Sequence, residues 1–362
     1  MASKATWHAG IRASVKDPPP LISFVAVGQV APLTGFLREI GAPLERLLRQ
    51  SHIPVALIEE AEALLPLHLV HRLLEVAASS EGIPDFGVVL GERTTVFDLP
   101  ILGSALGRAV TVRDYLQRGI QLIGEVQPGE RFWLTLEPGR VRFHQVVPGR
   151  LCAGRHHADL YTLAVTIQML RRFIGGDWSP LDVHLAATDR SLVGDGSVFG
   201  DAEIRLGQPH SSFTISAASL MRTLPPEVRV MSEATRPAGF QTAIPQDFLS
   251  SLEKITLDLL KAEALRIEAV AEAAELSTRT MQRRLGDIGL TYSTLVAQVR
   301  CRMAVELLSQ TDLPVRQIST ALGYTDPANF TRAFRRTAGK SPQEYRSRCR
   351  LAAEAGCRAR AG

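Results

Sequence analysis

The stretch Ala321–Arg346, ALGYTDPANFTRAFRRTAGKSPQEYR, decides the fold of the C-terminal part of the chain. Asp326 followed by Pro327 predicts the start of a helix, because an Asp side chain caps free N–H groups and Pro suits the first helical position. Phe330 and Phe334 recur one helical turn apart, which predicts one buried face with polar residues on the other side. The stretch therefore predicts the second helix of a helix-turn-helix unit.

The same pattern occurs earlier in the chain, so the C-terminal part is an internal repeat. In LSTRTMQRRL, residues 276–285, Met281 and Leu285 match Phe330 and Phe334 at one constant offset, and Ser277 predicts the helix cap. Between the copies the sequence predicts one continuous helix. About 17 helical residues span ~25 Å, which with the flanking turns suits two recognition helices one DNA turn, about 34 Å, apart.

Charge separates the two parts of the chain. The whole chain carries +4, but the segment 276–350 holds thirteen basic and five acidic residues, a net +8, whereas everything before Leu276 carries a net −5. A basic helical module on a near-neutral body indicates a polyanionic partner. Arg, Gln and Asn at outward positions can make bidentate contacts with base edges in the DNA major groove, so double-stranded DNA is the predicted partner.

Most of this module resembles the AraC/XylS family of bacterial transcription regulators. The motifs that carry the resemblance are LSTRTMQRRL, RCRMAVELL and ISTALGYTDPANFTRAFRRTAGKSPQEYR. The resemblance implies base contacts by Arg279, Gln282, Arg283, Pro327, Ala328, Asn329, Thr331 and Arg332. Phosphate contacts are expected from Arg284, Arg335, Arg336 and Lys340. The second copy offers Pro327 and Ala328 where relatives often carry polar residues, so its readout depends on Asn329 and Arg332.

The N-terminal part predicts an α+β domain over residues 28–222, because helical patterns precede strand patterns. RFWLTLE (131–137) and RVRFHQVV (140–147) predict a hairpin, a helix is expected over 157–174, and LDVHLAA and SSFTISAA predict short strands. Residues 1–27 are expected to be a poorly ordered lead-in, 223–246 a linker, 247–350 the all-α DNA-binding domain, and 351–362 a flexible tail.

This part also resembles the arabinose-binding-type sensor and dimerisation domain of the same family. The resemblance rests on FLREIGAPLERLLRQSHIP, GVVLGERTTVFDLPILGSALGRAVTVRDYL and RFWLTLEPGRVRF. It implies control by a small-molecule effector of unknown identity. Effector-pocket candidates on the hairpin are Phe132, Trp133, Arg142 and Phe143, for which ordinary core packing is the alternative.

Other chemistry is not indicated by the sequence. The four cysteines form no CxxC pair, and His68 and His71, at helical spacing, have no third metal ligand beside them, so neither a metal nor a cofactor is expected. No nucleophile elbow or phosphate loop is present, which argues against an enzyme. The N-terminus lacks a signal-peptide core and no apolar run would span a bilayer, so a cytoplasmic location is expected.

We therefore predict a sequence-specific, effector-controlled transcription regulator, and activation as its mode. RNA polymerase and a second copy of the chain are further expected partners. Two alternatives remain open: the DNA-binding module is fused either to an enzymatic N-terminal domain or to a ligand-independent architectural one.

Overall fold

The computed structural model describes residues 22–60, 63–95, 98–99, 109–127, 130–146, 154–225, 244–245, 247–349 and 351. The chain divides into two compact units between Ile244 and Pro245. None of the helices in these ranges is both long and apolar enough to cross a membrane.

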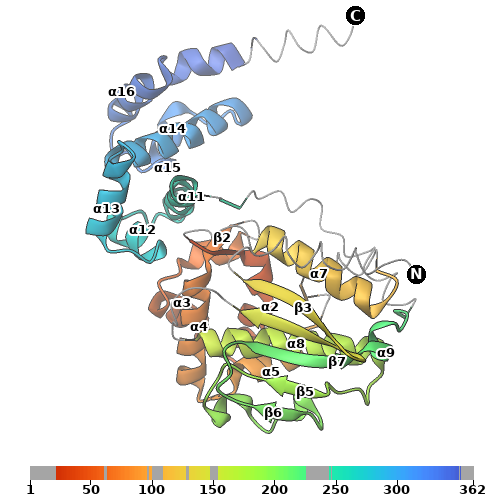
Figure 1. Ribbon diagram of the computed structural model, residues 1–362. Helices are drawn as coiled ribbons and strands as arrows, with labels where there is room; N and C mark the ends of the chain where they lie inside the picture. Colours follow the sequence, from red (N-terminus) through yellow and green to blue (C-terminus); the bar gives the residue numbers. More distant parts are fainter. Residues whose placement is uncertain are drawn as a thin grey trace, which may run out of the picture. The chain divides into compact units, whose positions relative to one another are not determined.

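The N-terminal unit combines helices with two sheets (Figure 1). Its helices are α2 (Val27–Glu39), α3 (Leu44–Gln50), α4 (Leu67–Glu81), α5 (Phe86–Arg93), α7 (Val112–Val126), α8 (Arg155–Ile174) and α9 (Ala217–Leu220), with 3-10 turns η2 (Val55–Glu59), η4 (Arg190–Val193) and η5 (Ser197–Phe199). Its strands are β1 (Phe24–Ala26), β2 (Leu64–Pro66), β3 (Arg131–Glu137), β4 (Arg140–Val146), β5 (Asp182–His184), β6 (Glu203–Arg205) and β7 (Ser211–Ser216). The unit is therefore of the mixed α/β kind that the sequence predicts.

The larger sheet has the strand order β3-β4-β7-β5-β6. Neighbouring strands run antiparallel except β5 and β6, which are parallel. The hairpin register opposes Phe132 to Gln145 and Leu134 to Phe143. Because successive side chains of a strand point to opposite faces, Phe132, Leu134 and Phe143 are buried on one face of the sheet.

Helix α8 forms one core with that apolar face. Leu160, Leu163, Ile167 and Leu170 are almost fully buried and belong to the same hydrophobic cluster as the sheet residues. Figure 1 shows α8 and α5 running across one side of the sheet. The start of α8 approaches α4 so closely that a methyl group on Gly154 would overlap the backbone oxygen of His71, and Gly154 also has a φ of 77°. Glycine is therefore required where α8 begins.

Local signals explain where α7 begins. The Thr111 side chain accepts from the Asp114 N–H and the Asp114 carboxylate accepts from the Thr111 N–H, at 3.2 Å and 3.1 Å. This reciprocal capping box satisfies two N–H groups that a helix start leaves free. Val112, Tyr115 and Leu116 then lie on the buried face of α7.

The C-terminal unit is entirely helical in its described residues (Figure 1). Its helices are α11 (Phe248–Lys261), α12 (Ile267–Ala273), α13 (Thr278–Asp287), α14 (Tyr292–Gln310), α15 (Val315–Ala321) and α16 (Pro327–Ala338), followed by helical residues 342–349. Helices α12 and α15 are equal in length, and each is followed by a tight turn and a longer, arginine-bearing helix. The repeat in the sequence is therefore a repeat of structure.

Some expectations need correction. The expected lead-in extends too far, since Phe24–Ala26 form β1 and pair with the distant strand β2. Strands β1, β2 and β6 were not predicted, because each is very short. Leu136 shares the face of β3 that buries Phe132 and Leu134, yet it is 51% exposed near the tip of the hairpin. The expected lead-in before residue 22, most of the expected linker and nearly all of the expected tail lie outside the described residues.

Candidate nucleic-acid interface and N-terminal cavity

The first helix-turn-helix unit consists of α12 and α13. The Ser277 hydroxyl accepts from the Thr280 N–H at 3.2 Å, which confirms the predicted cap. Met281 and Leu285 are fully buried. With these two residues fixed inward, Arg279, Gln282 and Arg283 are exposed on the opposite side of α13. Helix α13 thus presents three donor-bearing side chains to the solvent.

The second unit consists of α15 and α16. The Asp326 carboxylate accepts from the Ala328 N–H at 2.9 Å, and Pro327 occupies the first turn, as predicted. Phe330 and Phe334 are buried with ring centroids 5.8 Å apart. Tyr345 packs edge-on against Phe334 and anchors the segment that follows α16. These aromatic contacts orient α16 on the rest of the unit.

The outward side of α16 carries a preformed polar pair. Pro327, Ala328, Asn329 and Arg332 are exposed, whereas Thr331 is half-buried and its hydroxyl donates to the Pro327 carbonyl. The Arg332 guanidinium donates to the Asn329 side-chain oxygen at 2.5 Å. The structure therefore brings Asn329 and Arg332 together, and both side chains can present donors to one base step.

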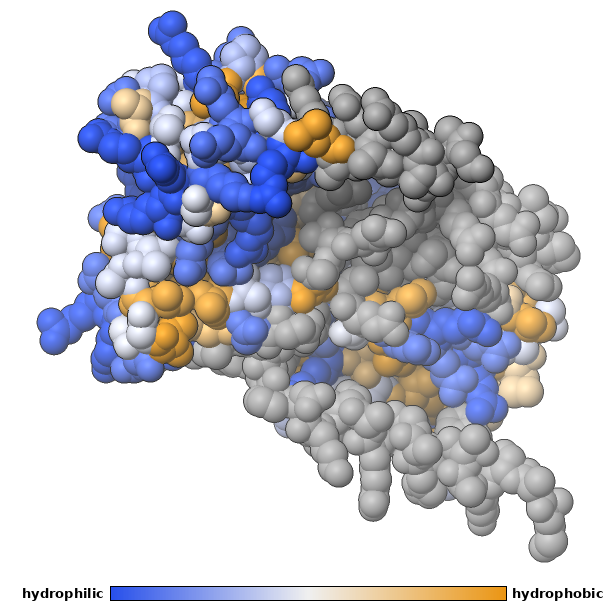
Figure 2. Space-filling model, turned by 90° about the horizontal axis from the view of Figure 1, so that it is seen from above, coloured by the Kyte–Doolittle hydropathy of each residue, from blue (hydrophilic) through white to orange (hydrophobic). Residues whose placement is uncertain are grey.

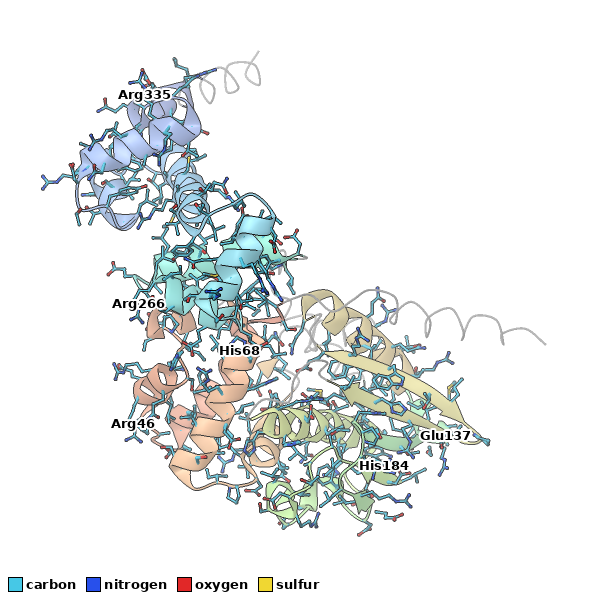
Figure 3. All side chains as sticks on the ribbon, turned by 60° about the vertical axis from the view of Figure 1, so that its left-hand side comes forward. Arg46, His68, Glu137, His184, Arg266 and Arg335 are labelled. Carbon is cyan, nitrogen blue, oxygen red and sulfur yellow. The ribbon has the colours of Figure 1, made fainter. Side chains whose placement is uncertain are left out.

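The four predicted phosphate-binding cations differ in their surroundings. Arg335 and Arg336 are exposed on α16, where Figure 3 labels Arg335. Lys340 is half-buried. Arg284 is also half-buried, and its guanidinium lies 5.6 Å from the centre of the Phe248 ring of α11. Arg284 is thus the least available of the four to a phosphate.

Hydrophilic side chains dominate the surface of this unit, on the left of Figure 2. Two of the arginines counted in the basic surplus, however, make contacts within the C-terminal unit. Arg346 donates to the backbone oxygen of Leu313 at 2.6 Å. Arg300 lies over the Tyr324 ring, 4.7 Å from its centroid. The charge count from the sequence included Arg346 and Arg300. Nothing in their local sequence pattern identifies these long-range partners.

Helix α14 connects the two helix-turn-helix units as one continuous helix. It has 19 residues, and Leu295, Val299, Ala304 and Leu308 are buried along it. Met303 and Leu307, which continue the four-residue spacing of Leu295 and Val299, are only partly buried. The stripe shifts by one residue along the helix, since the helical period is about 3.6 residues rather than four.

The N-terminal unit contains a cavity of about 140 Å³. Its wall comes from β1, α2, α4, α5, α7, β3, β4 and α8, and most of its side chains are apolar, among them Leu33, Val70, Leu116, Phe132 and Val165. Of the predicted effector-pocket candidates, Phe132 and Phe143 line this cavity. The sequence did not indicate the other wall residues, because eight separate elements contribute to the wall.

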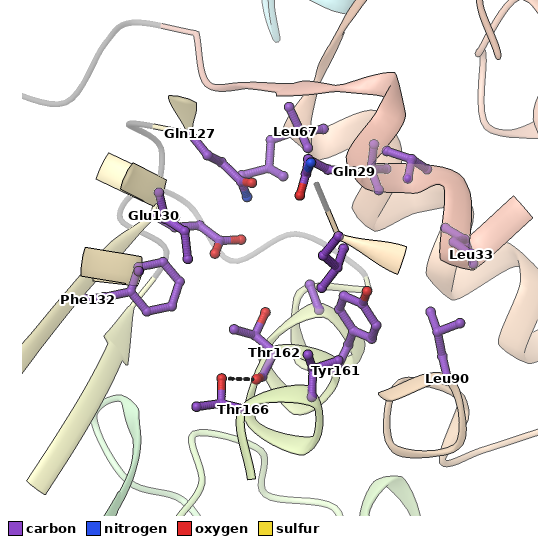
Figure 4. A pocket seen from close by; sticks show the side chains of 18 of the residues that line it. Gln29, Leu33, Leu67, Leu90, Gln127, Glu130, Phe132, Tyr161, Thr162 and Thr166 are labelled. Carbon is purple, nitrogen blue, oxygen red and sulfur yellow. Dashed lines mark hydrogen bonds between the residues drawn. The ribbon is translucent and has the colours of Figure 1, made fainter. Parts of the chain in front are cut away.

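One end of the cavity is polar (Figure 4). Glu130, at the start of β3, directs its carboxyl group into the cavity, and the side-chain amides of Gln29 and Gln127 point toward the same region. Burial, reinforced by the Asp159 carboxyl, raises the pKa of Glu130 to about 8. Glu130 is therefore protonated near neutral pH.

The neighbours of Glu130 form a buried charged group behind the cavity wall. Asp159 lies 3.9 Å from the Arg155 guanidinium, and both side chains are almost fully buried. Burial raises the pKa of Asp159 to about 7, against the lowering effect of Arg155. Burial also lowers the pKa of His71 to about 4, so His71 is neutral near neutral pH.

Trp133 and Arg142 do not line the cavity, contrary to expectation. Both lie on the other face of the sheet, where Trp133 stacks on His144 with centroids 4.7 Å apart. Arg142 donates to Asp182 at 2.7 Å and also contacts Glu137, which lies at the tip of the hairpin (Figure 3). Trp133 follows Phe132 and Arg142 precedes Phe143, and neighbouring residues of a strand face opposite sides of the sheet.

His71 and His157 are buried in helices of the N-terminal unit. His71 is buried in the cavity wall, and His157 is buried with its ring 3.7 Å from Glu75. No group of three or more potential metal ligands occurs among the described residues.

Two helix-turn-helix units with polar, basic outward sides, fixed on one connecting helix, define a DNA-binding transcription regulator. A model of a helix-turn-helix domain matches residues 270–348. The model described as "Arabinose-binding domain of AraC transcription regulator, N-term" matches residues 41–224, just over half of the chain. The chain belongs to the AraC family of transcription regulators, which are not enzymes, and it binds DNA through its helix-turn-helix domain.

The chain is similar to known regulators over most of its length. The ornithine utilization regulator of Pseudomonas aeruginosa is 25% identical over 89% of this chain and 96% of its own length. The regulator VirS of Mycobacterium tuberculosis is 27% identical over 87% of this chain and 94% of its own. The crystal structure of the regulator CdpR from Pseudomonas aeruginosa covers 84% of this chain and 96% of its own, at 21% identity and a TM-score of 0.38.

Proposed function

We propose that this chain reads two successive major grooves of one DNA site and that a small molecule in its N-terminal cavity controls this binding. The observation that carries the first half is the connection of two matched helix-turn-helix units by one unbroken helix. At about 1.5 Å per residue the 19 residues of α14 span about 28 Å. With the flanking turns this suits recognition helices about 34 Å apart, one turn of DNA.

Base readout is assigned to the exposed outward positions of α13 and α16. On α13, Arg283 and Gln282 suit bidentate contacts to guanine and adenine. On α16, the bonded pair of Asn329 and Arg332 supplies the specific donors, while the short Ala328 allows close approach or contact with a thymine methyl group. Pro327, Thr331 and Arg279 complete the proposed base-contacting set.

Phosphate contacts are assigned chiefly to Arg335 and Arg336, because they are the exposed members of the predicted set. Lys340 and Arg284 contribute less, since both are half-buried. These contacts position the protein and carry no sequence information of their own.

Effector control is supported by the cavity. It is enclosed mainly by apolar side chains and has polar groups gathered at one end, as small-molecule sites commonly do. A bound effector would shift the population of N-terminal states and thereby the DNA binding of the C-terminal unit. We further propose activation as the mode of regulation, on the family resemblance alone.

The experiment for DNA reading is genomic DNA capture with purified full-length protein at about 150 mM salt, where non-specific phosphate binding is weak. A few sharp peaks sharing a motif of two parts, one DNA turn apart, are expected. A flat profile both with and without cell extract would contradict the proposal.

The experiment for effector control uses a DNA site found in this way. A low-molecular-weight cell extract should change the affinity of the native protein for the site. Ala158→Leu, which fills part of the cavity, should abolish the response and leave the affinity without extract unchanged. Gln168→Leu changes the same helix outside the cavity wall and should retain the response. An equal response in all three proteins would refute the cavity as the effector site.

A further inference from the structure

The chemistry of the cavity wall restricts the ligand. Among the described residues that line the cavity there is no Arg and no Lys, so an anionic ligand would have no cation to pair with there. Glu130 is the only acidic residue in that wall, and it is 7% exposed. No ion pair to Glu130 forms within the described part of the chain.

The charged residues behind the wall do not neutralise Glu130. Arg155 is paired with Asp159, so this buried group holds two carboxyl groups and one guanidinium. His71, on the opposite side in α4, is kept neutral by burial and by Arg155, and Tyr161 of α8 is a neutral phenol because burial raises its pKa. Burial and the Asp159 carboxyl outweigh the attraction of Arg155, so ionised Glu130 has no sufficient counter-charge among the described residues and retains its proton near neutral pH.

A protonated amine would supply this counter-charge. Its ammonium group would pair with Glu130, while the side-chain oxygens of Gln127 and Thr162, both in the wall, would accept its remaining hydrogens. The apolar wall, with Phe132, Leu116 and Ile120, would enclose the hydrocarbon part of the ligand. The size is also informative, since an apolar cavity of about 150 Å³ holds one benzene molecule.

We propose that the cavity binds a compact, mainly apolar amine whose ammonium group pairs with the Glu130 carboxylate. This inference rests on the proposed function, because it names the class of effector for the same cavity. Binding is coupled to proton release: Glu130 loses its proton when the ammonium group arrives. No covalent step is involved.

The test uses three probes of similar size on the full-length protein: benzylamine, benzyl alcohol and benzoate. Isothermal titration near neutral pH, repeated in two buffers with different heats of ionisation, measures affinity and proton release together. Benzylamine should bind at least about tenfold more tightly than benzyl alcohol, since an ion-paired hydrogen bond is stronger than a neutral one. It should release close to one proton, and benzoate should bind most weakly.

Glu130→Gln is the decisive variant because it keeps the shape and removes the charge. It should lose the preference for benzylamine and the proton release, but still bind benzyl alcohol. Glu59→Gln, at an exposed position, should behave like the native protein. A melting curve for each variant verifies that it is folded.

Three results would overturn the proposal: benzoate or benzyl alcohol binding as tightly as benzylamine, benzylamine binding without proton release, or no binding of any probe. None of these decides whether the cavity is an effector site. That question is answered by the extract experiment with Ala158→Leu. If only this variant loses the response to extract, the cavity remains the proposed effector site, and only the amine class of the ligand is refuted.

Discussion

The guanidinium group of Arg300, on α14, lies 4.7 Å from the ring centroid of Tyr324, in the turn between α15 and α16. Tyr324 in turn packs against Phe330, with centroids 5.5 Å apart. The connecting helix is thus joined to the turn and to the core of the second helix-turn-helix unit by one cation–π contact.

Arg300→Ala should lower the free energy of unfolding of the C-terminal unit by about 1 kcal/mol, as expected for a half-buried cation–π pair. It should also weaken binding to a two-part DNA site, because the second unit becomes less firmly oriented. Urea denaturation and titration with DNA measure the two effects. Arg316→Ala, at an exposed position on α15, is the stability control. Equal loss of stability in both variants would show that the contact with Tyr324 is not the cause.

Arg283→Ala and Arg336→Ala should affect DNA binding differently. Loss of a bidentate base contact should reduce discrimination at one or two base pairs by ~1–3 kcal/mol. Loss of Arg336 should weaken binding to all sequences about equally and reduce the salt dependence by roughly one phosphate contact. Binding measured against single-base variants of the site, at several salt concentrations, separates the two. A uniform loss in both variants would contradict the assigned docking.

The turns of the two helix-turn-helix units make a matched pair for testing backbone strain. Glu275 and Gly323 occupy equivalent positions in the two copies, with φ of 54° and 71°. The hydrogen bonds around them correspond: Leu276 N–H donates to Ala271, and Tyr324 N–H to Ser319. Since a left-handed residue other than glycine costs roughly 1 kcal/mol or more, Glu275→Gly should stabilise the unit and Gly323→Ala should destabilise it.

Thermal unfolding of the C-terminal unit within the full chain measures both variants of this pair. Gly35→Ala, at a helical glycine of α2 in the other unit, serves as the control for a glycine change with an ordinary φ. If Gly323→Ala had no more effect on the C-terminal transition than this control, the strain at the turn would be negligible.

Glu130→Gln should change the pH dependence of stability. Its raised pKa means that between about pH 4.5 and 8 the folded state holds a proton that the unfolded state has lost, so the native protein loses stability as the pH rises through this window. The Glu130→Gln variant does not show this loss of stability, because glutamine does not titrate. Its advantage over the native protein should grow by on the order of 3 kcal/mol between about pH 5 and pH 8.

Asp159 contributes in the same direction, since its pKa is raised to about 7, and it remains in the variant. His71 acts oppositely: its lowered pKa means that stability is lost as the pH falls from 6.5 toward 4. Chemical denaturation of the native protein, Glu130→Gln and Glu59→Gln at several pH values measures the difference. A constant gap between Glu130→Gln and the native protein would show that Glu130 is ionised in the folded state.

Much of the C-terminal unit could be predicted from the sequence because its signals are local. Ser277 and Asp326 cap their helices, and the pairs Met281/Leu285 and Phe330/Phe334 define the buried side, so the outward residues follow from helical geometry. The contacts of Arg300 and Arg346 could not be predicted, because their partners, Tyr324 and Leu313, lie several helical turns away along the chain.

The N-terminal unit was less predictable for the opposite reason. Its cavity is formed by side chains from eight elements, and the short strands β1 and β2 are defined only by their pairing with each other. One error was avoidable. Phe132 and Trp133 are adjacent in a strand, so only one of them could face the cavity, and the alternation of buried residues already indicated which.

The unbroken course of α14 also restricts how the target DNA can vary. One residue inserted into this helix would turn everything beyond it by about 100° and advance it by about 1.5 Å, so the second unit would face away from the groove that it is proposed to read. On the proposed two-groove reading, promoters would join or leave this regulator's control by changing bases, whereas a change of a few base pairs between the two parts of the site would put them out of phase with the protein. The length of α14 would thus fix the spacing between the two parts of each DNA site.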